Sequence, residues 1–463
     1  MQKRDPSDIV NSLPKTRKRV LLMTTLQEKR AHFNSKFIIT NNGGEVSVDG
    51  GLVLIKEFFH QTNFQKLVKK FIPFRQKRSN SLHSFEEILE LVLYQIYAGY
   101  EQDDSHDDLK SDPAFQSLLE TESSASQPTV SRFWDDLSEE VLVGIEKLID
   151  YLNEGARFSR KQTELVIDID STHFDTFGQQ ENTDYNAHYG TYGYHPLVAF
   201  DGVHGDFLKA ELRPGNVYTS TGAETFIQQL LSHVRQESPL LNSIVLRADS
   251  GFASPAIYNV CEEQMTDYLI RLKSNARLKK LAKNEMDGLQ SNDYTKTDSH
   301  YFDLDYKAAS WSHSRRVSVL AKRPEGELFY QYTFVVNTFS EDIPAKDIIK
   351  AYKRRGVMEN DIKEAKNGFF MGKTDSTKFQ TNRARMYVSQ LAYTLIQLLK
   401  SNCLPKEDST STMATIRHKL LKVAVKVAKH ARKIYFNLST SHVYGKKFFT
   451  VLENIRNFQI KVP

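Results

Sequence analysis

Residues 164–170 read ELVIDID, and this short run sets the expected architecture of the chain. Its apolar, largely β-branched residues alternate with acidic ones at the end, which predicts a buried strand. Because side chains alternate across a strand, Asp168 and Asp170 are expected on the same face. A carboxylate at the end of a buried strand is costly unless a cation or hydrogen bonds compensate it. Asp170 is therefore the first candidate for chemistry.

The segments after this strand predict a mixed α/β sheet. HPLVAF and FLKAELRP flank a turn at Asp201-Gly202, which is typical of a β-hairpin. A meander followed by alternating helices and strands favours an α/β core. The expected elements are a helix at 221–237, the strand SIVLRAD (243–249), a helix at 254–263 and the strand YLIRL (268–272).

Asp249 repeats the situation of Asp170. The apolar strand IVLRA delivers it just before Ser250-Gly251, at a strand end. Ligand and catalytic sites in α/β sheets gather at such ends. A single aspartate there is explained equally well by capping the next helix, but two on separate core strands favour a site.

A third acidic group lies in the run YKRRGVMENDIKEAK, residues 352–366. The run places four functional side chains at intervals of three, four and seven: Tyr352, Arg355, Glu359 and Lys366. At about 100° per residue, they fall within about 60° on one helical face. An exposed charged face is the alternative, and Asp361 and Glu364 mean that composition alone does not single out Glu359.

Carboxylates converging from two strands and a helix form an oxygen-rich site suited to Mg²⁺ or Mn²⁺. Two such ions about 4 Å apart promote in-line displacement at a phosphodiester. No phosphate-binding P-loop occurs in the 463 residues, which agrees with phosphoryl transfer that uses no ATP.

The charge of the chain is unevenly distributed. Residues 1–40 carry net +6 and residues 401–463 carry net +9, which leaves −10 in between for a total of +5. Basic ends around an acidic middle favour a polyanionic partner, although basic tails also serve solubility. No apolar run is long enough to span a bilayer, no signal peptide is evident, and Cys261 and Cys403 indicate a reducing compartment.

The flanks of the α/β core are expected to be mainly helical. In SASQPTVSRFWDDL, Pro128 behind Ser126 predicts a helix start, and this helix either reads DNA or simply packs. Residues 275–340 are rich in strand-like runs, 345–367 predicts one long helix, and 386–399 predicts a buried helix. TIRHKLLKVAVKVAKHARK (415–433) predicts an amphipathic helix, with its basic face either on DNA or solvated.

These motifs together resemble bacterial insertion-sequence DDE transposases. The intervals in 352–366 match the Y-R-E-K signature of the IS-four-like group, and IDIDST and LRADSGF resemble its two Asp motifs. The context IYAGYEQDDSHDDLKSDPAF, SQPTVSRF, YGYHPLVAFDG and LRPGN is similar to the IS-thirteen-eighty-type branch. The resemblance covers nearly the whole chain.

The resemblance implies an RNase H-like core, interrupted by a β-rich insertion and flanked by helical regions. It makes Asp170, Asp249 and Glu359 the ligands of two Mg²⁺ or Mn²⁺ ions, with Asp168 in a supporting position. The residues that it places on DNA are Tyr352, Arg355, Lys366, Trp311 (stacked on a displaced base), Arg213 and Asn216. For Trp311 a core position is the alternative, and for the LRPGN residues a turn is; His188 and His195 are expected to be structural.

The expected function is a DNA transposase that cleaves transposon ends and joins the freed 3′-OH to target DNA. The alternatives are a metal-dependent nuclease without strand transfer and a catalytically silent DNA-binding protein. The expected partners are double-stranded DNA and a second copy of the chain, with no membrane, in the bacterial cytoplasm at the nucleoid. The expected regions are a basic arm (1–35), a helical DNA-binding region (36–160), the core (161–274 and 341–400), the insertion (275–340) and a basic C-terminal region (401–463).

Overall fold

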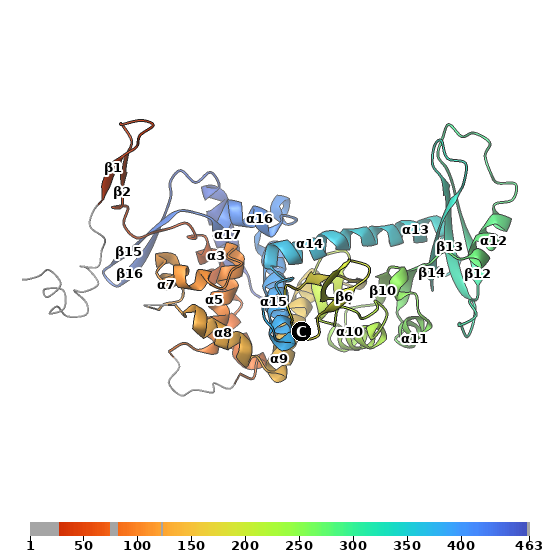
Figure 1. Cartoon of the computed structure of the whole chain (residues 1–463), viewed down its shortest axis with the longest axis horizontal. Coiled ribbons are helices and arrows are strands. Elements are labelled where there is room, and N and C mark those ends of the chain that lie inside the picture. Colours follow the sequence, from red (N-terminus) through yellow and green to blue (C-terminus); the bar gives the residue numbers. More distant parts are fainter. Residues whose placement is uncertain (1–26, 75–81, 122–123, 461–463) are drawn as a thin grey trace, which may run out of the picture.

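The computed structural model describes residues 27–74, 82–121 and 124–460. Figure 1 shows an elongated molecule with a helical region at one end, an α/β centre and a long β-blade at the other end. A single sheet of eight strands joins the centre to the blade, in the order β12-β13-β14-β11-β10-β4-β8-β9. Its strands are β4 (Glu164–Ser171), β8 (Leu197–Asp201), β9 (Phe207–Glu211), β10 (Ser243–Ala248), β11 (Asp267–Leu272), β12 (Asp298–Tyr306), β13 (Arg315–Arg323) and β14 (Gln331–Asn337).

The order of the central strands confirms the expected RNase H-like core. β4, β8 and β9 form an antiparallel meander, and β10 and β11 then add in parallel on the other side of β4. In the β4–β10 register, Asp168 lies opposite Arg247 and Ile169 lies opposite Ala248. Asp170 and Asp249 come next on each strand, so they leave the sheet at the same edge.

Helices cover both faces of this core because alternate strand residues are apolar on both sides. Leu197, Ala199 and Leu208 pack against α10 (Ala223–Glu237) and α11 (Pro255–Glu263). Phe200 and Phe207 face the opposite way and join the apolar residues of α9 (Glu139–Arg160) and α15 (Phe379–Cys403). Ile167 and Ile169 belong to the first cluster, so Asp168 and Asp170 face the second side of the sheet.

The strand-rich segment after β11 extends the central sheet, because β14 pairs antiparallel with β11. β12, β13 and β14 form the blade at the right of Figure 1, accompanied by α12 (Ala276–Glu285). A separate three-stranded sheet, β5 (Phe174–Asp175), β7 (Thr191–Tyr194) and β6 (Asp184–Asn186), follows the end of β4.

The N-terminal part is helical beyond three short strands. Its strands are β1 (Glu28–Arg30), β2 (Ile38–Thr40) and β3 (Val46–Ser47), and its helices are α3 (Leu52–Gln61), α4 (Phe64–Phe71), α5 (Phe85–Ala98), α6 (Ser105–Leu109), α7 (Pro113–Leu118) and α8 (Gln127–Asp136). The helix start predicted behind Ser126 is confirmed, because α8 has Pro128 in its first turn, and Val130, Phe133 and Trp134 of this helix are buried. Most of the basic arm (residues 1–26) lies outside the described residues. None of the helices in the described ranges is long and apolar enough to cross a membrane.

The helix predicted over 345–367 is interrupted. α13 (Ala345–Lys353) and α14 (Met358–Phe369) are separated by a 3₁₀ turn at Arg354–Val357. Each residue of a 3₁₀ turn rotates the chain by about 120° instead of about 100°, so positions before and after it no longer share one helical face.

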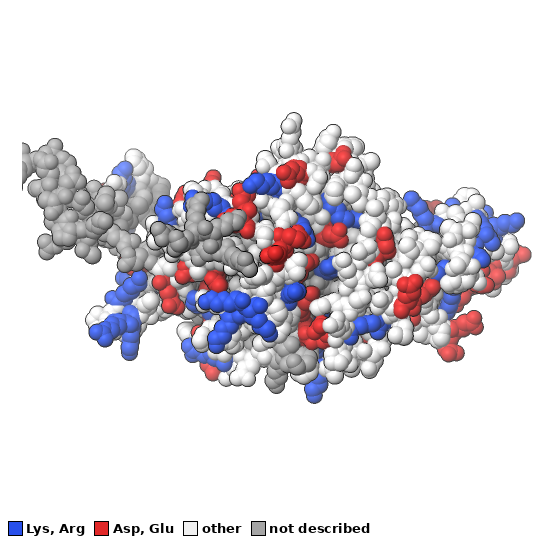
Figure 2. Space-filling model, turned by 90° about the horizontal axis from the view of Figure 1, so that it is seen from below, with Lys and Arg blue, Asp and Glu red and all other residues white. Residues whose placement is uncertain are grey.

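The amphipathic helix predicted over 415–433 is wrong beyond its first turns. After α16 (Met413–Ile416) and one π-helical turn (Arg417–Leu421), the chain forms the hairpin β15 (Val425–His430) and β16 (Lys433–Leu438), and then α17 (Gly445–Asn457). Val423, Val425 and Val427 are buried with a period of two, and β15 also pairs with β3. The β-branched residues therefore suit a strand, and its lysines are exposed on a hairpin instead of a helix. Figure 2 shows basic side chains gathered at the left end of the molecule, the end that carries this hairpin.

Candidate active site

Two carboxylates lie at the edge where β4 and β10 end. Asp170 is partly buried, and its Oδ1 accepts a hydrogen bond from the backbone N–H of Ser171 at 2.9 Å. Asp249 is also partly buried and caps the short 3₁₀ turn at Ser250–Phe252, where its Oδ1 accepts from the N–H of Gly251 at 2.8 Å. Each backbone bond orients one oxygen and leaves the other oxygen free for a further partner.

The environment of Asp170 disfavours its charge. Burial raises the pKa of this carboxyl to about 6, Arg355 opposes that rise, and the neighbouring Asp249 adds to it. The Arg355 Nη2 donates to Asp170 Oδ2 at 2.6 Å, so a guanidinium occupies the oxygen that the backbone leaves free. The pair of carboxylates is thus partly neutralised by a cation from the 3₁₀ turn.

Asp168 lies two residues deeper on the same strand and has a different role. It is 0% exposed, and both of its oxygens accept from the Arg247 guanidinium, at 2.6 Å from Nε and 2.7 Å from Nη2. Arg247 also donates to the Ala351 carbonyl of α13 at 2.8 Å. Asp168 therefore ties β4 to β10 and to α13, and its oxygens are already in use.

Arg247 was not anticipated from the sequence. Its signal is a lone charge inside the otherwise apolar strand SIVLRA, which requires a buried partner of opposite charge.

Of the predicted residues around the 3₁₀ turn, Tyr352 is buried, and Arg355 and Lys366 are partly buried. Tyr352 is buried in the small cluster formed with Ile348 and Ile349. Lys366 Nζ donates to the backbone carbonyl of His173 at 2.7 Å, close to the end of β4, and burial lowers its pKa. Arg355 and Lys366 therefore both reach the sheet edge that carries Asp170.

Glu359 is not brought together with the two aspartates in this structure. Its side chain is exposed and forms no hydrogen bond or ion pair with any described residue. Within residues 27–74, 82–121 and 124–460, no group of three or more His, Cys, Asp or Glu side chains has a geometry that could hold a metal ion. The 3₁₀ turn directly precedes α14, which carries Glu359, and Arg355 of that turn pairs with Asp170.

Two residues expected on DNA lie in the interior. Arg213 is 4% exposed and donates to backbone carbonyls of its own region, at 3.0 Å to His195 and 2.7 Å to Thr221. Trp311 is 6% exposed and packs edge-on against Tyr258 and Tyr306. The turn and core alternatives fit these positions, because neither side chain is accessible to DNA here.

The remaining polar residues near the site hold loops in place. Asn216 is exposed and donates to Asp184 Oδ2 at 2.5 Å, which joins the LRPGN loop to the small sheet. His195 is buried with its Nδ1 2.8 Å from the Val217 carbonyl, a structural position, while His188 is exposed. His173, which the sequence did not single out, is buried beside Thr191, with 2.9 Å between Nε2 and Oγ1.

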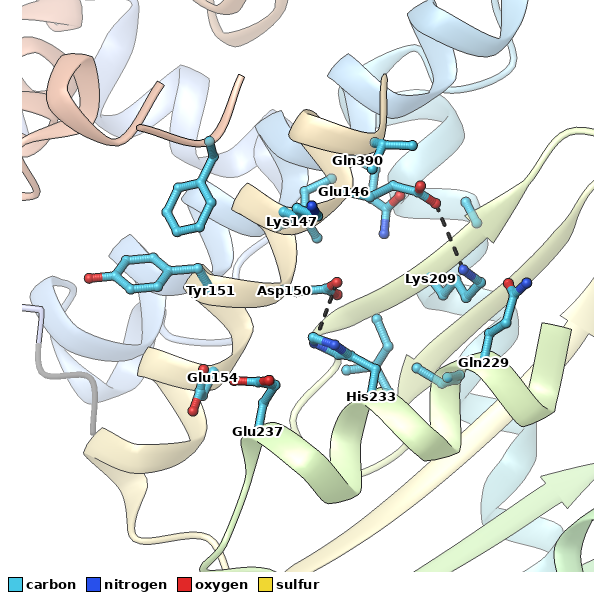
Figure 3. Close-up of a pocket in the computed structure, with 16 residues that line it drawn as sticks. Glu146, Lys147, Asp150, Tyr151, Glu154, Lys209, Gln229, His233, Glu237 and Gln390 are labelled. Atoms are coloured by element: carbon cyan, nitrogen blue, oxygen red, sulfur yellow. Dashed lines mark ion pairs between the residues drawn. The ribbon is translucent and has the colours of Figure 1, made fainter. Parts of the chain in front are cut away.

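A cavity of about 500 Å³ lies elsewhere, between α9, α10 and the edge strand β9 (Figure 3). Acidic and basic side chains face each other across it, including Asp150 with His233 at 3.4 Å and Glu146 with Lys209 at 3.8 Å. None of the predicted site residues lines it. We therefore place the candidate active site at the open sheet edge, not in this cavity.

Comparisons with known proteins identify the family of the chain. The family described as "Transposase DDE domain group 1" matches residues 29–460. One similar solved structure is the "Cryo-EM structure of piggyBac transposase synaptic complex with hairpin DNA", with 10% identity, a TM-score of 0.43, and 86% of this chain and 83% of that chain covered. Another is the "Crystal structure of the Mos1 mariner paired end complex with Mn", with 13% identity, a TM-score of 0.18, and 51% and 89% covered. A search of curated proteins found no match. At these TM-scores, neither structural likeness supports a statement about chemistry.

Proposed function

The chain belongs to the transposase DDE domain group 1 family, and from that premise we propose that Asp170 and Asp249 hold the divalent cation used for DNA cleavage. As a DDE transposase, it is an enzyme that cleaves DNA and transfers the cut strands. The observation that supports the assignment is the pair of partly buried carboxylates at the ends of two adjacent parallel strands.

The donor set fits a hard cation. Asp170 and Asp249 offer carboxylate oxygens only, the ligand type of Mg²⁺ and Mn²⁺, and no cysteine lies among them. Burial raises the pKa of Asp170, and the neighbouring Asp249 adds to that rise, so a bound cation would favour the charged form of this carboxyl. When bound, one or two such ions would activate the attacking oxygen and stabilise the leaving oxygen of a phosphodiester.

Glu359 is our proposed third ligand, and the proposal rests on the Y-R-E-K spacing of the IS-four-like group, IS-thirteen-eighty-type branch. Its side chain is exposed and unpaired among the described residues, so it is free to turn toward the sheet edge. For the site to close, Arg355 must release Asp170 Oδ2, and a DNA phosphate offers its guanidinium a replacement partner.

The basic residues of the edge would position the DNA backbone. Arg355 and Lys366 lie on either side of Glu359 along the chain and both contact the end of β4 or the segment after it. Arg355 suits bidentate binding of a phosphate, and Lys366 acts as a point charge. Tyr352 is buried with Ile348 and Ile349 just before the 3₁₀ turn, where it would support the turn that carries Arg355.

We further propose that the helical region at 36–160 binds DNA, and that two copies act together on two transposon ends at the bacterial nucleoid. Lys and Arg at the hairpin end of the molecule offer additional backbone contacts (Figure 2).

Mapping of cut strands tests the function. The protein is incubated with the DNA that flanks its own gene and Mg²⁺, and products are resolved at nucleotide resolution. We expect cuts at defined positions at the ends, followed by joined products with target DNA. Cuts without joined products would favour the nuclease alternative, and no cuts under any divalent cation would contradict the proposal.

A further inference from the structure

The hairpin formed by β1 and β2 projects away from the rest of the chain. Figure 1 shows it at the upper left, standing clear of the helical region. The two strands pair with each other, and every residue in both strands is exposed. An isolated two-stranded hairpin is only marginally stable in water. This hairpin would therefore gain stability from a partner.

One face of the hairpin is apolar and carries a lysine. Lys29 lies directly opposite Ile39, and Phe37 shares their face because side chains alternate along a strand. The ring of Phe33 packs against that of Phe37, with centroids 5.1 Å apart. The exposed fractions are 80% for Phe33, 56% for Phe37 and 62% for Ile39. Contiguous exposed apolar side chains of this kind mark an interaction surface.

The hairpin is also basic. Residues 27–42 contain three Lys or Arg and one Glu, which gives a net charge of +2. Lys29, Arg30 and Lys36 are exposed, and none of them forms an ion pair with a residue that the structure describes. A surface that suits this hairpin must therefore offer both apolar contacts and negative charge.

The cavity between α9, α10 and β9 offers an apolar wall. Phe71 and Tyr151 line it with ring centroids 5.1 Å apart, together with Leu208 and Leu230. Its volume of about 500 Å³ lies within the range of roughly 300–1,000 Å³ for clefts that bury a ligand. The cavity therefore has room for apolar side chains of the hairpin.

The same cavity is acidic. Its lining contains four acidic side chains and two lysines, so its net charge is negative when His233 is neutral. Three of the acids, Glu146, Asp150 and Glu154, follow one another at intervals of four residues along α9 and so share one side of that helix. Negative walls disfavour DNA phosphates and favour a basic partner.

Two of the acidic side chains stand together at this cavity. Glu154 of α9 and Glu237 of α10 lie side by side in Figure 3, and neither forms an ion pair or hydrogen bond within the described part of the chain. Burial raises the pKa of Glu154, and the charge of Glu237 adds to that rise, while Arg157 and His233 oppose it. A cation placed between the two carboxylates would favour their charged forms.

The hairpin lies far from the cavity of its own chain. In Figure 1 β1 and β2 are at the left end, whereas α9 and α10 are at the lower centre. A hairpin from a second copy meets no such restriction. Two copies related by a twofold axis would exchange hairpins and form the same contact twice.

We propose that the β1–β2 hairpin of one copy binds in the cavity between α9 and α10 of a second copy. Lys29 lies between Glu154 and Glu237, and Phe37 packs against the wall that contains Tyr151. The choice of a second copy as the occupant rests on the proposed function, in which two copies act together on two transposon ends.

Cross-linking between two variants tests the contact. Lys29→Cys and Glu154→Cys proteins are mixed as full chains, with and without end DNA, and treated with a short bis-maleimide; the native Cys261 and Cys403 are buried. Lys283→Cys mixed with Glu154→Cys is the control, because Lys283 is an exposed lysine on α12. We expect a covalent product of twice the chain mass from the first mixture only. No such product, or an equal yield from the control mixture, would overturn the proposal.

Charge reversal tests the same contact without a cross-linker. Sedimentation velocity over a concentration series should show that Lys29→Glu and Glu154→Lys each weaken self-association roughly tenfold, and that the double variant Lys29→Glu/Glu154→Lys recovers most of the loss. A double variant as weak as either single variant would contradict the pairing. Weaker binding of end DNA by Lys29→Glu, with unchanged self-association, would assign the hairpin to DNA and overturn the proposal.

The apolar part of the contact has a matched control. Phe37→Ala should weaken self-association by about tenfold or more, as for an anchor residue of an interface. Phe329→Ala should leave it unchanged, because Phe329 is 80% exposed in the distal blade. An equal effect of both substitutions would contradict the proposal.

Cleavage assays on the same preparations separate this inference from the proposed function. A wild-type protein that forms the cross-link and cuts no DNA would leave the interface standing and reject the catalytic role. A protein that cuts end DNA and forms no cross-link would reject the interface alone.

Discussion

Asp168 and Asp170 lie two residues apart on one strand and face the same side of the sheet, yet they do different work. The inner layer, Asp168 with Arg247, is buried and fully paired. The outer layer, Asp170 with Asp249, is partly exposed, and Arg355 from another element binds one oxygen of Asp170. The comparison shows that two carboxylates on one strand differ in how they are paired: one buried guanidinium binds both oxygens of Asp168, whereas Arg355 binds a single oxygen of Asp170 at the strand end.

The largest effect is expected in the outer layer. Asp170→Asn and Asp249→Asn, and Glu359→Gln as the proposed third ligand, should each lower DNA cleavage on the order of a thousandfold, because each removes a proposed ligand of the cation that stabilises the transition state. Binding of end DNA, measured by gel shift, should stay within a few fold. Full cleavage by any of the three with Mg²⁺ supplied would remove that residue from the ligand set.

Substitutions in the inner layer should lower the stability of the protein. Asp168→Asn leaves the Arg247 guanidinium buried without its anion, and we expect a loss of about 3–5 kcal/mol in the free energy of unfolding. Urea denaturation measures it. The double variant Asp168→Leu/Arg247→Met should be more stable than either single variant, because no buried charge is left unpaired. An Asp168→Asn protein of normal stability that fails to cleave would instead place Asp168 in the reaction.

The outer layer should also make the affinity for a divalent cation depend on pH. The pKa of Asp170 is raised to about 6, above its ordinary value of 3.8, so its carboxyl is protonated below about pH 6 and charged above it. The apparent affinity for Mn²⁺ should therefore fall about tenfold per pH unit below about pH 6 and level off above pH 7. Mn²⁺ titrations from pH 5 to pH 8 test this. Constant affinity across that range would show that Asp170 is already charged at pH 5 or takes no part in binding.

The smallest effect is expected for Lys366, the lysine beside the outer layer. Lys366→Ala should weaken binding of end DNA and make the slope of log K against log salt shallower by about 0.9, as for one lost phosphate contact. Lys283→Ala, an exposed lysine on α12 in the distal blade, is the matched control. A loss of affinity that does not vary with salt would point to the Lys366–His173 contact as a structural one.

The positions of the outer-layer aspartates at strand ends could be predicted from the sequence, whereas the inner-layer ion pair could be predicted only in part. Asp170 and Asp249 follow from apolar strands that end in a carboxylate, a local pattern. Which acidic residue on 352–366 belongs with them came only from the resemblance, and the local 3₁₀ turn at Arg354–Val357 changes the helical phase on which that argument relied. The Asp168–Arg247 pair joins residues 79 apart, and no local pattern announces it.

The difference between local sequence patterns and contacts of distant residues also explains the wrong predictions outside the site. The apolar residues of 415–433 fit both a helical and an alternating pattern. The strand forms because β15 pairs with β3, which is distant in the sequence. Trp311 and Arg213 were expected on DNA because of the family resemblance, but burial is a tertiary property, and both lie inside.

The most direct test of the central claim is to locate the cation itself. Fe²⁺ with ascorbate and peroxide, substituted for Mg²⁺ in the protein bound to end DNA, cleaves the peptide backbone wherever the ion sits. We predict fragments that end near residues 170 and 249, with a third near 359 if that residue closes the site, and we predict their loss in an Asp170→Asn/Asp249→Asn double variant. Fragments that map elsewhere, or that persist unchanged in the double variant, would contradict a metal site at this edge of the sheet.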